Sequence, residues 1–101
     1  MHTEELIPRN TEGPVCSADL ARAVTLARAY GATRLILFGS AVDSPSEARD
    51  LDLACDGVEG WRLFELGAAL EDELRRPLDL VPLSPPTRFT RLVEARGRVL
   101  L

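Results

Sequence analysis

The chain has 101 residues, of which 46% are hydrophobic and 28% charged, and its formal net charge at pH 7 is −4. This length and composition are those of one globular domain with its own core, and no apolar run reaches the roughly 20 residues of a membrane span. Proteins that bind nucleic acid usually carry a basic surface, so the negative charge disfavours direct nucleic-acid binding.

Some kinds of chemistry are excluded by residues that the chain lacks. It has no lysine, which excludes a phosphate-loop lysine and Schiff-base chemistry. Its single histidine, His2, lies in the expected lead-in, which argues strongly against a Ser-His triad. Cys16 and Cys55 fit no zinc spacing and are predicted to be reduced, partly buried thiols. The N-terminal segment has no apolar stretch typical of a secretory signal, so we expect a cytoplasmic protein.

The first half of the chain predicts a lead-in, a helix and two strands. Residues 1–15 show no periodicity and are expected to be a flexible N-terminal lead-in to a single domain over residues 16–101. Ser17 can cap a helix. The stretches 33–38 and 50–55 have the apolar, β-forming character of strands. Because the connection between them is too short for a helical crossover, we expect antiparallel neighbours.

The second half predicts a long helix, a strand, a last helix and a short edge strand. The helix spans residues 60–75 and carries a leucine stripe, and Trp61 and Phe64 are expected to widen its apolar face and pack in the core. The stretch "LDLVPL" is the strand, and Ser84 and Pro85 suit the first positions of the last helix. This order predicts a small α+β domain with helices packed on one face of a mixed sheet.

Three aspartates stand on segments that otherwise have the character of buried strands. Side chains alternate across a strand, so Asp50 and Asp52 should share one face, about 6–7 Å apart along the strand. Asp79 lies between leucines in the next strand and would join them if the two strands pair. Like charges this close repel each other, unless their face is open to water or a cation lies between them. Mg²⁺ is the usual cation for carboxylates with substrate phosphates.

A Gly-Ser pair precedes the aspartates at the end of the first strand. Gly39 lets a phosphate approach the backbone, and Ser40 offers a hydroxyl group. Three carboxylates on one sheet face could hold two metal ions for in-line displacement at phosphorus. The alternative is that Asp50, Asp52 and Asp79 are solvated residues on the wet face of a sheet.

In this order, "FGS", "DLDLA" and "LDLV" resemble the minimal nucleotidyltransferases (MNT proteins) of the DNA polymerase beta superfamily, over about residues 18–101. The resemblance implies that Asp50 and Asp52 bind metal, that Asp79 is the third, catalytic carboxylate, and that Gly39 and Ser40 bind the nucleotide phosphates. It also implies a minimal polymerase-beta-like fold, ATP as substrate and two Mg²⁺ ions as cofactors. Members of this family transfer a nucleoside monophosphate to a hydroxyl group and release pyrophosphate.

The sequence also departs from the family pattern. Residues 41–44 replace a segment that often begins with an arginine or aromatic residue, and the gap between Ser40 and Asp50 is one residue shorter than usual. Arg49 stands where the family often has serine, and it could contact the triphosphate or pair with a neighbouring acid. Larger relatives add a helical domain that binds the acceptor, so here we expect a partner or a second copy of the chain to supply the acceptor.

Two functions from different classes follow. Many small members of the family are paired with a HEPN-domain toxin, and the resemblance implies an antitoxin enzyme that moves AMP from ATP to a tyrosine of that partner. The altered segment after Ser40 favours the alternative, an antitoxin with a weak or inactive site that neutralises its partner by binding. A transferase for a small molecule is a third reading.

Overall fold

The computed structural model describes residues 13–101, and residues 1–12, with His2 and most of the predicted lead-in, lie outside the described part. The elements follow the predicted order, with one addition, a short helix directly after Gly39. In chain order they are α1 (Ser17–Ala29), β1 (Arg34–Phe38), α2 (Ser40–Asp43), β2 (Leu51–Asp56), α3 (Trp61–Leu74), β3 (Leu78–Pro82), α4 (Arg88–Arg96) and β4 (Arg98–Val99).

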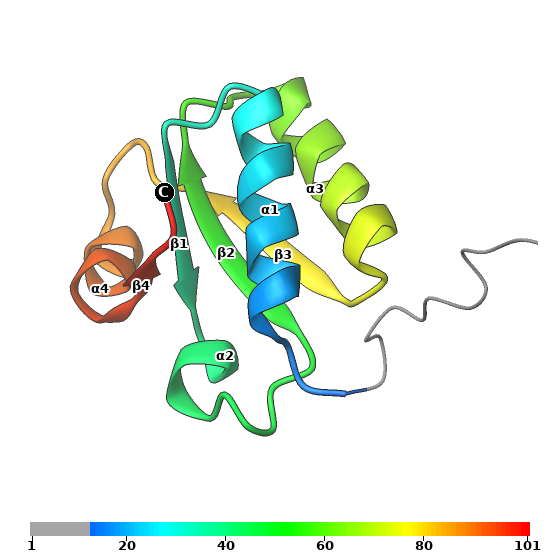
Figure 1. The fold of residues 1–101 in the computed structure, drawn as a ribbon. Helices are drawn as coiled ribbons and strands as arrows, with labels where there is room; N and C mark the ends of the chain where they lie inside the picture. Colours follow the sequence, from blue (N-terminus) through cyan, green and yellow to red (C-terminus); the bar gives the residue numbers. More distant parts are fainter. Residues whose placement is uncertain (1–12) are drawn as a thin grey trace, which may run out of the picture.

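The strands form one mixed sheet in the order β3-β2-β1-β4 (Figure 1). β1 pairs antiparallel with β2, as predicted, and antiparallel with β4 at the edge. β2 and β3 are parallel, with α3 as the crossover between them. This pairing brings the two acid-bearing strands side by side, which the site requires.

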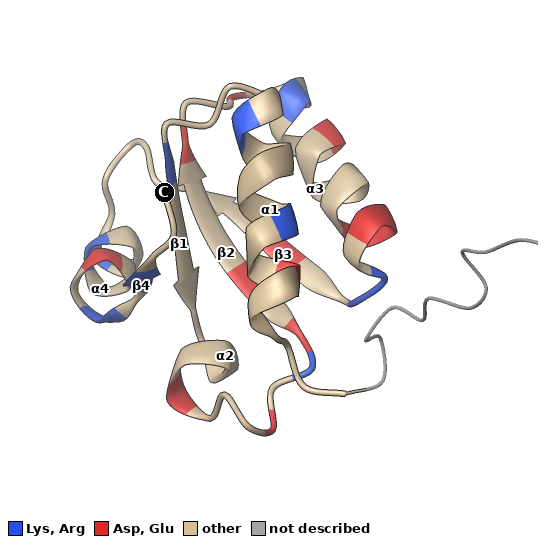
Figure 2. Ribbon diagram, viewed as in Figure 1, with Lys and Arg blue, Asp and Glu red and all other residues tan. Residues whose placement is uncertain are grey.

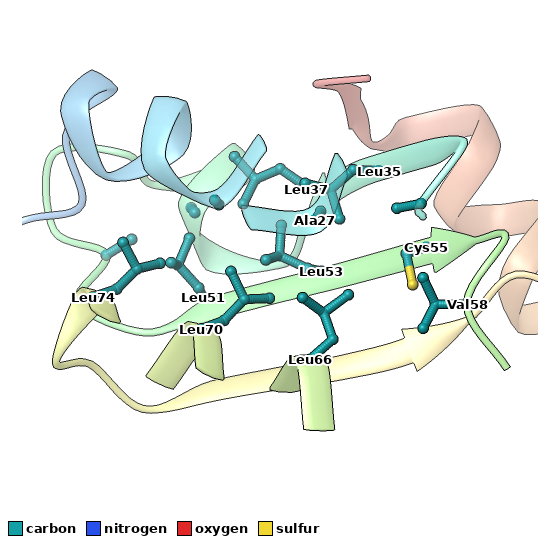
Figure 3. Close-up of a cluster of buried hydrophobic side chains, with 14 residues drawn as sticks. Ala27, Leu35, Leu37, Leu51, Leu53, Cys55, Val58, Leu66, Leu70 and Leu74 are labelled. Atoms are coloured by element: carbon teal, nitrogen blue, oxygen red, sulfur yellow. The ribbon is translucent and has the colours of Figure 1, made fainter. Parts of the chain in front are cut away.

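The main core lies between the sheet and the two long helices, α1 and α3. Leucines from alternate positions of β1 and β2 meet the leucine stripe of α3 there (Figure 3). Each fully buried leucine contributes roughly 1.5–3 kcal/mol, so this layer fixes which face of β2 points inward. The larger buried members are Leu35, Leu37, Leu51, Leu53, Leu66, Leu70 and Leu74.

The prediction of helices on one face of a mixed sheet is confirmed for α1 and α3, and α4 lies on the opposite face. Val93 of α4 forms a second cluster with Ile36 and Ala54, whose positions alternate with those of the main core. The rings of Phe38 and Phe89 extend this contact edge to face, with 5.5 Å between their centroids. Apolar residues on both faces of β1 therefore draw a helix to each side.

Two helices begin at other residues than the sequence predicted. Cys16, and not Ser17, is the N-cap of α1, because its backbone N–H donates to the carboxylate of Asp19. α4 begins after Thr87, whose hydroxyl accepts from the backbone N–H of Thr90 at 3.1 Å. Pro85 precedes another proline, which disfavours helical backbone there, so the predicted start at Ser84 and Pro85 was wrong.

The prediction that Trp61 and Phe64 pack in the core was also wrong. Trp61 is 76% exposed and Phe64 74%, and their rings contact one another on the surface of α3. At about 100° per residue, Trp61 lies about 140° around the helix from Leu66, well away from the buried stripe. The two thiols are free, with Cys55 buried and Cys16 partly exposed, as predicted. No helix within residues 13–101 is both long enough and apolar enough to span a membrane.

Candidate functional site

Two of the predicted acids are direct neighbours in the sheet. Asp52 of β2 and Asp79 of β3 are paired residues in the parallel register. Paired residues on adjacent strands point to the same face, and Leu51 and Leu53 occupy the opposite, buried face. Asp52 is partly buried and Asp79 exposed, so both carboxylates can be reached from solvent. Figure 2 marks the acidic positions on these two strands.

Asp50 lies immediately before β2 and is exposed. Its charge still acts on Asp52. Burial raises the pKa of Asp52 above its ordinary value of 3.8, and the negative charges of Asp79 and Asp50 raise it further, as does a side-chain hydrogen bond with Asp79. The three acids therefore form one electrostatic unit centred on Asp52.

This unit fits a divalent cation by its chemistry. Carboxylate oxygens are the ligands that Mg²⁺ prefers, and a cation would offset the repulsion between the adjacent carboxylates of Asp52 and Asp79. Within residues 13–101, however, no three His, Cys, Asp or Glu side chains are already gathered at metal-binding distance.

Gly39, the first residue of the Gly-Ser pair, lies directly against Asp52. Its φ of 76° and ψ of −148° lie outside the region that side chains tolerate. A Cβ built there would overlap Oδ2 of Asp52 and lie 3.2 Å from its Cγ. The missing side chain therefore lets the carboxylate of Asp52 lie directly against the backbone of Gly39. Ser40, the next residue, is exposed at the start of α2.

Arg76 is a structural residue of the site that the sequence reasoning missed. Its side chain is fully buried and pairs with the buried Asp19 at 3.1 Å. It also donates to three carbonyl oxygens, those of Gly13, Pro14 and Arg49, at 2.8 to 3.2 Å. One side chain thus ties the segment before α1 to the residue that precedes Asp50, and it does so from the turn that leads into β3.

The carbonyl oxygen of Arg49 is therefore bound by the buried side chain of Arg76, while the side chain of Arg49 is exposed. The residues predicted to form the lead-in are likewise tied where the structure describes them. Besides the contacts with Arg76, the backbone N–H of Val15 donates to the carbonyl of Ala48 at 2.8 Å. The burial of Arg76 could not be predicted from the sequence, because nothing distinguishes it from the rest of the 12 arginines.

No protein-family model and no curated protein matches the sequence. Solved structures do match its fold. A complex of tri-AMPylated Shewanella oneidensis HEPN toxin with MNT antitoxin aligns with a TM-score of 0.67 and 22% identity, over 83% of this chain and 70% of that chain. A toxin–antitoxin structure with AMP-PNP aligns with a TM-score of 0.69 and 21% identity, over 81% of this chain and 72% of that chain.

A third structure matches nearly end to end. It is assigned as a minimal nucleotidyltransferase, and it aligns with a TM-score of 0.63 and 29% identity, over 96% of this chain and 94% of that chain. The same fold therefore recurs in MNT–HEPN complexes and in a protein of about the same length. The chain therefore has the fold of the MNT-type minimal nucleotidyltransferases, in agreement with the resemblance of its motifs.

Proposed function

We propose that this protein is a metal-dependent nucleotidyltransferase that moves AMP from ATP to a hydroxyl group of a HEPN-domain partner, a tyrosine in the first instance, and so acts as an antitoxin. The observation that carries the proposal is the pairing of Asp52 with Asp79 and the close packing of the Asp52 carboxylate against the Gly-Ser turn at Gly39. Support also comes from structural neighbours that contain an AMPylated HEPN toxin or AMP-PNP. An ATP substrate accords with the predicted cytoplasmic location.

In this proposal the chain's own residues position both reactants. Asp50, Asp52 and Asp79 would hold Mg²⁺, which would neutralise the phosphate charge and stabilise the attacking and leaving oxygens. Gly39 and Ser40 would bind the triphosphate. The acceptor oxygen forms a bond to the α-phosphorus, the bond from that phosphorus to the bridging oxygen breaks, and pyrophosphate leaves. The exposed carboxylate of Asp79 would take the acceptor proton.

A transfer assay with the purified complex tests the proposal. The protein, its HEPN partner, Mg²⁺ and ATP labelled at the α-phosphate are incubated, and label on the partner is counted. We expect Asp52→Asn to reduce labelling at least 100-fold, since an amide cannot supply the charge that the cation needs. Asp56→Asn, at the other end of β2 and equally part-buried, is the matched control and should label normally. Equal labelling by the Asp52→Asn variant would refute the proposal.

The second candidate, neutralisation by binding alone, has its own supporting observation. The exposed ring of Phe64 lines a groove of about 600 Å³ between α3 and the edge strand β3, with Leu80 and Pro82 in its wall, and the exposed ring of Trp61 contacts that of Phe64. Clustered exposed aromatic residues are typical of protein interfaces. We therefore propose that the HEPN partner docks on this surface, whether or not the acidic site is active.

Binding measurements separate the two candidates. The double variant Trp61→Ala, Phe64→Ala should weaken the complex about 30-fold or more, the scale of an interface hot spot. Val99→Ala removes an exposed apolar side chain at the opposite edge of the sheet and is the control. If Asp52→Asn still protects cells from the partner, binding alone suffices. If the Trp61, Phe64 variant binds normally, the partner docks elsewhere.

A further inference from the structure

A second, apolar cleft opens beside the candidate site. It has a volume of about 230 Å³ and lies between the end of β1, the short helix α2 and the helix α4. Gly39 belongs to its wall, and Gly39 is also the residue that lies against Asp52. The cleft and the acidic unit are thus on the same face of the sheet and adjoin at one residue.

The walls of this cleft are suited to a flat aromatic ring. Phe38, Val42 and Leu92 line it, together with Phe89, whose ring is packed edge to face on Phe38. Phe89 and Leu92 are each 50% exposed, so apolar surface stays open to a ligand there. Pockets that bind a whole small molecule usually have volumes of about 300–1,000 Å³. This cleft is smaller and suits one ring system.

Polar groups stand at the edge of the cleft. Arg96, in the last turn of α4, lines it together with Asp43 of α2. A guanidinium group can stack on a heterocyclic ring or donate to its ring nitrogens and carbonyl oxygens. An apolar floor with a charged donor at the rim is an arrangement that holds a nucleobase by stacking and then fixes its orientation.

We propose that this cleft binds the base of the nucleoside triphosphate, with the base stacked beside Phe89 and its edge facing Arg96. The inference rests on the proposed function, because it is the phosphates at Gly39 and the metal at Asp52 that bring the base to the adjoining cleft. It adds a base subsite made mainly by α4 to a site whose other residues come from the turn after β1, the start of α2, and β2 and β3 with the residue before β2. A nucleotide bound in this way spans both sides of Gly39.

Two probes test the inference: Mg²⁺ with a non-hydrolysable ATP analogue, and Mg²⁺ with tripolyphosphate, which has no base. Their dissociation constants are measured for the intact protein and for Phe89→Ala, Arg96→Ala and the control Arg91→Ala, an exposed arginine of α4 outside the cleft. Loss of base stacking should weaken the analogue about 5- to 150-fold in the Phe89→Ala protein. Arg96→Ala should weaken it in the same direction, whereas tripolyphosphate binding and the control should not change.

The other outcomes overturn the inference in distinguishable ways. If the intact protein binds both probes equally, the base contributes nothing, and the proposed function stands without this subsite. If the intact protein binds neither probe, the proposed function falls as well. If Phe89→Ala and Arg96→Ala bind nucleotide normally but lose the protein partner, the cleft receives an aromatic side chain of the acceptor. Equal weakening of both probes by Phe89→Ala would mean that Phe89 has a structural role only. If Phe89→Ala does not fold, Arg96→Ala, at an exposed residue, must by itself weaken the ATP analogue and leave tripolyphosphate binding unchanged.

Discussion

Asp52 combines partial burial with two acidic neighbours, and this setting has a cost for the protein without metal. Burial and the charges of Asp79 and Asp50 raise its pKa above 3.8, so the folded state binds a proton more tightly than the unfolded state. Stability from this group is then fully present below the unfolded pKa and is lost as the pH rises through the raised folded pKa. At pH 7 the ionised Asp52 destabilises the metal-free fold.

The first prediction follows from that sign. Without metal at pH 7, Asp52→Asn should unfold at a higher urea concentration than the intact protein, because the amide carries no charge to repel Asp79. The gain should vanish below about pH 4, where the carboxyl of Asp52 is protonated in both states. Mg²⁺ should then stabilise the intact protein and leave the variant unchanged. A variant less stable than the intact protein at pH 7 without metal contradicts this account.

Gly39 carries the second prediction at this scale. Gly39→Ala introduces a Cβ at a φ of 76° and against the carboxylate of Asp52. Backbone strain of this kind costs about 1–3 kcal/mol, and the overlap adds to it. Gly31→Ala is the matched control, since its φ is also positive, at 100°, but its Cβ would meet open space. Urea unfolding should show a loss for Gly39→Ala that exceeds the control by about 1 kcal/mol or more. Equal losses would mean that the contact with Asp52 is unimportant.

At the scale of single residues, periodicity predicted more than residue type did. The alternation of a strand placed Asp52 opposite the leucines, and the later strand "LDLV" placed Asp79 on the same face. The contact of Gly39 with Asp52 depends on how β1 and β2 are paired, which no local pattern encodes. The exposure of Trp61 could have been predicted from its angle on the helix, because it lies away from the stripe of Leu66.

At the scale of elements, the buried pair of Arg76 and Asp19 links helix, loop and strand. Asp19 sits in the first turn of α1, accepts the backbone N–H of Cys16 and also pairs with Arg22 at 2.8 Å. Arg76 follows α3 and reaches the carbonyl of Arg49. Removing Arg76 would leave the buried carboxylate of Asp19 with only Arg22 and one backbone N–H as partners. The two residues lie far apart in the sequence, and no local pattern predicts their pairing.

The third prediction concerns this pair. Arg76→Ala should destabilise the protein by about 3–5 kcal/mol, a large share of the roughly 5–15 kcal/mol of a typical domain. Arg76→Lys should rescue little, because an ammonium group cannot reach a carboxylate and three carbonyls with the geometry of a guanidinium. Arg75→Ala, the exposed neighbour, is the control. Urea unfolding measures all three, and a loss under 1 kcal/mol for Arg76→Ala would contradict the structural role.

Helix boundaries show where local rules compete. The sequence "SPPTRFT" offers two caps, and Ser84 with Pro85 is the more familiar one. Thr87 prevails because it forms a reciprocal box with Thr90 and because Pro86 keeps the preceding residue out of helical backbone. The elements themselves were predictable from apolar periodicity, and the errors lie within a few residues of their ends.

At the scale of the whole molecule, the sequence predicted the antiparallel pairing of β1 with β2 and the two long helices, but not the side on which α4 packs. That choice depends on Ile36 and Ala54, which alternate with the core residues and form a smaller apolar face. The smaller face is what positions α4 next to Gly39 and creates the cleft at the site. Strands buried on both faces show continuous apolar runs. The run "LILF" therefore indicates that both faces of β1 are covered, but it does not indicate which helix covers the second face.

The central claim is that the acidic unit transfers AMP to a protein partner, and one measurement tests it most directly. The chain is co-expressed with the product of the neighbouring reading frame, the pair is purified, and the intact mass of the partner is determined. The account predicts a gain of one or more AMP units with the intact protein and no gain with Asp52→Asn. A stable complex whose partner carries no added mass would contradict it, and would make Asp50, Asp52 and Asp79 acids without a catalytic role in this pair.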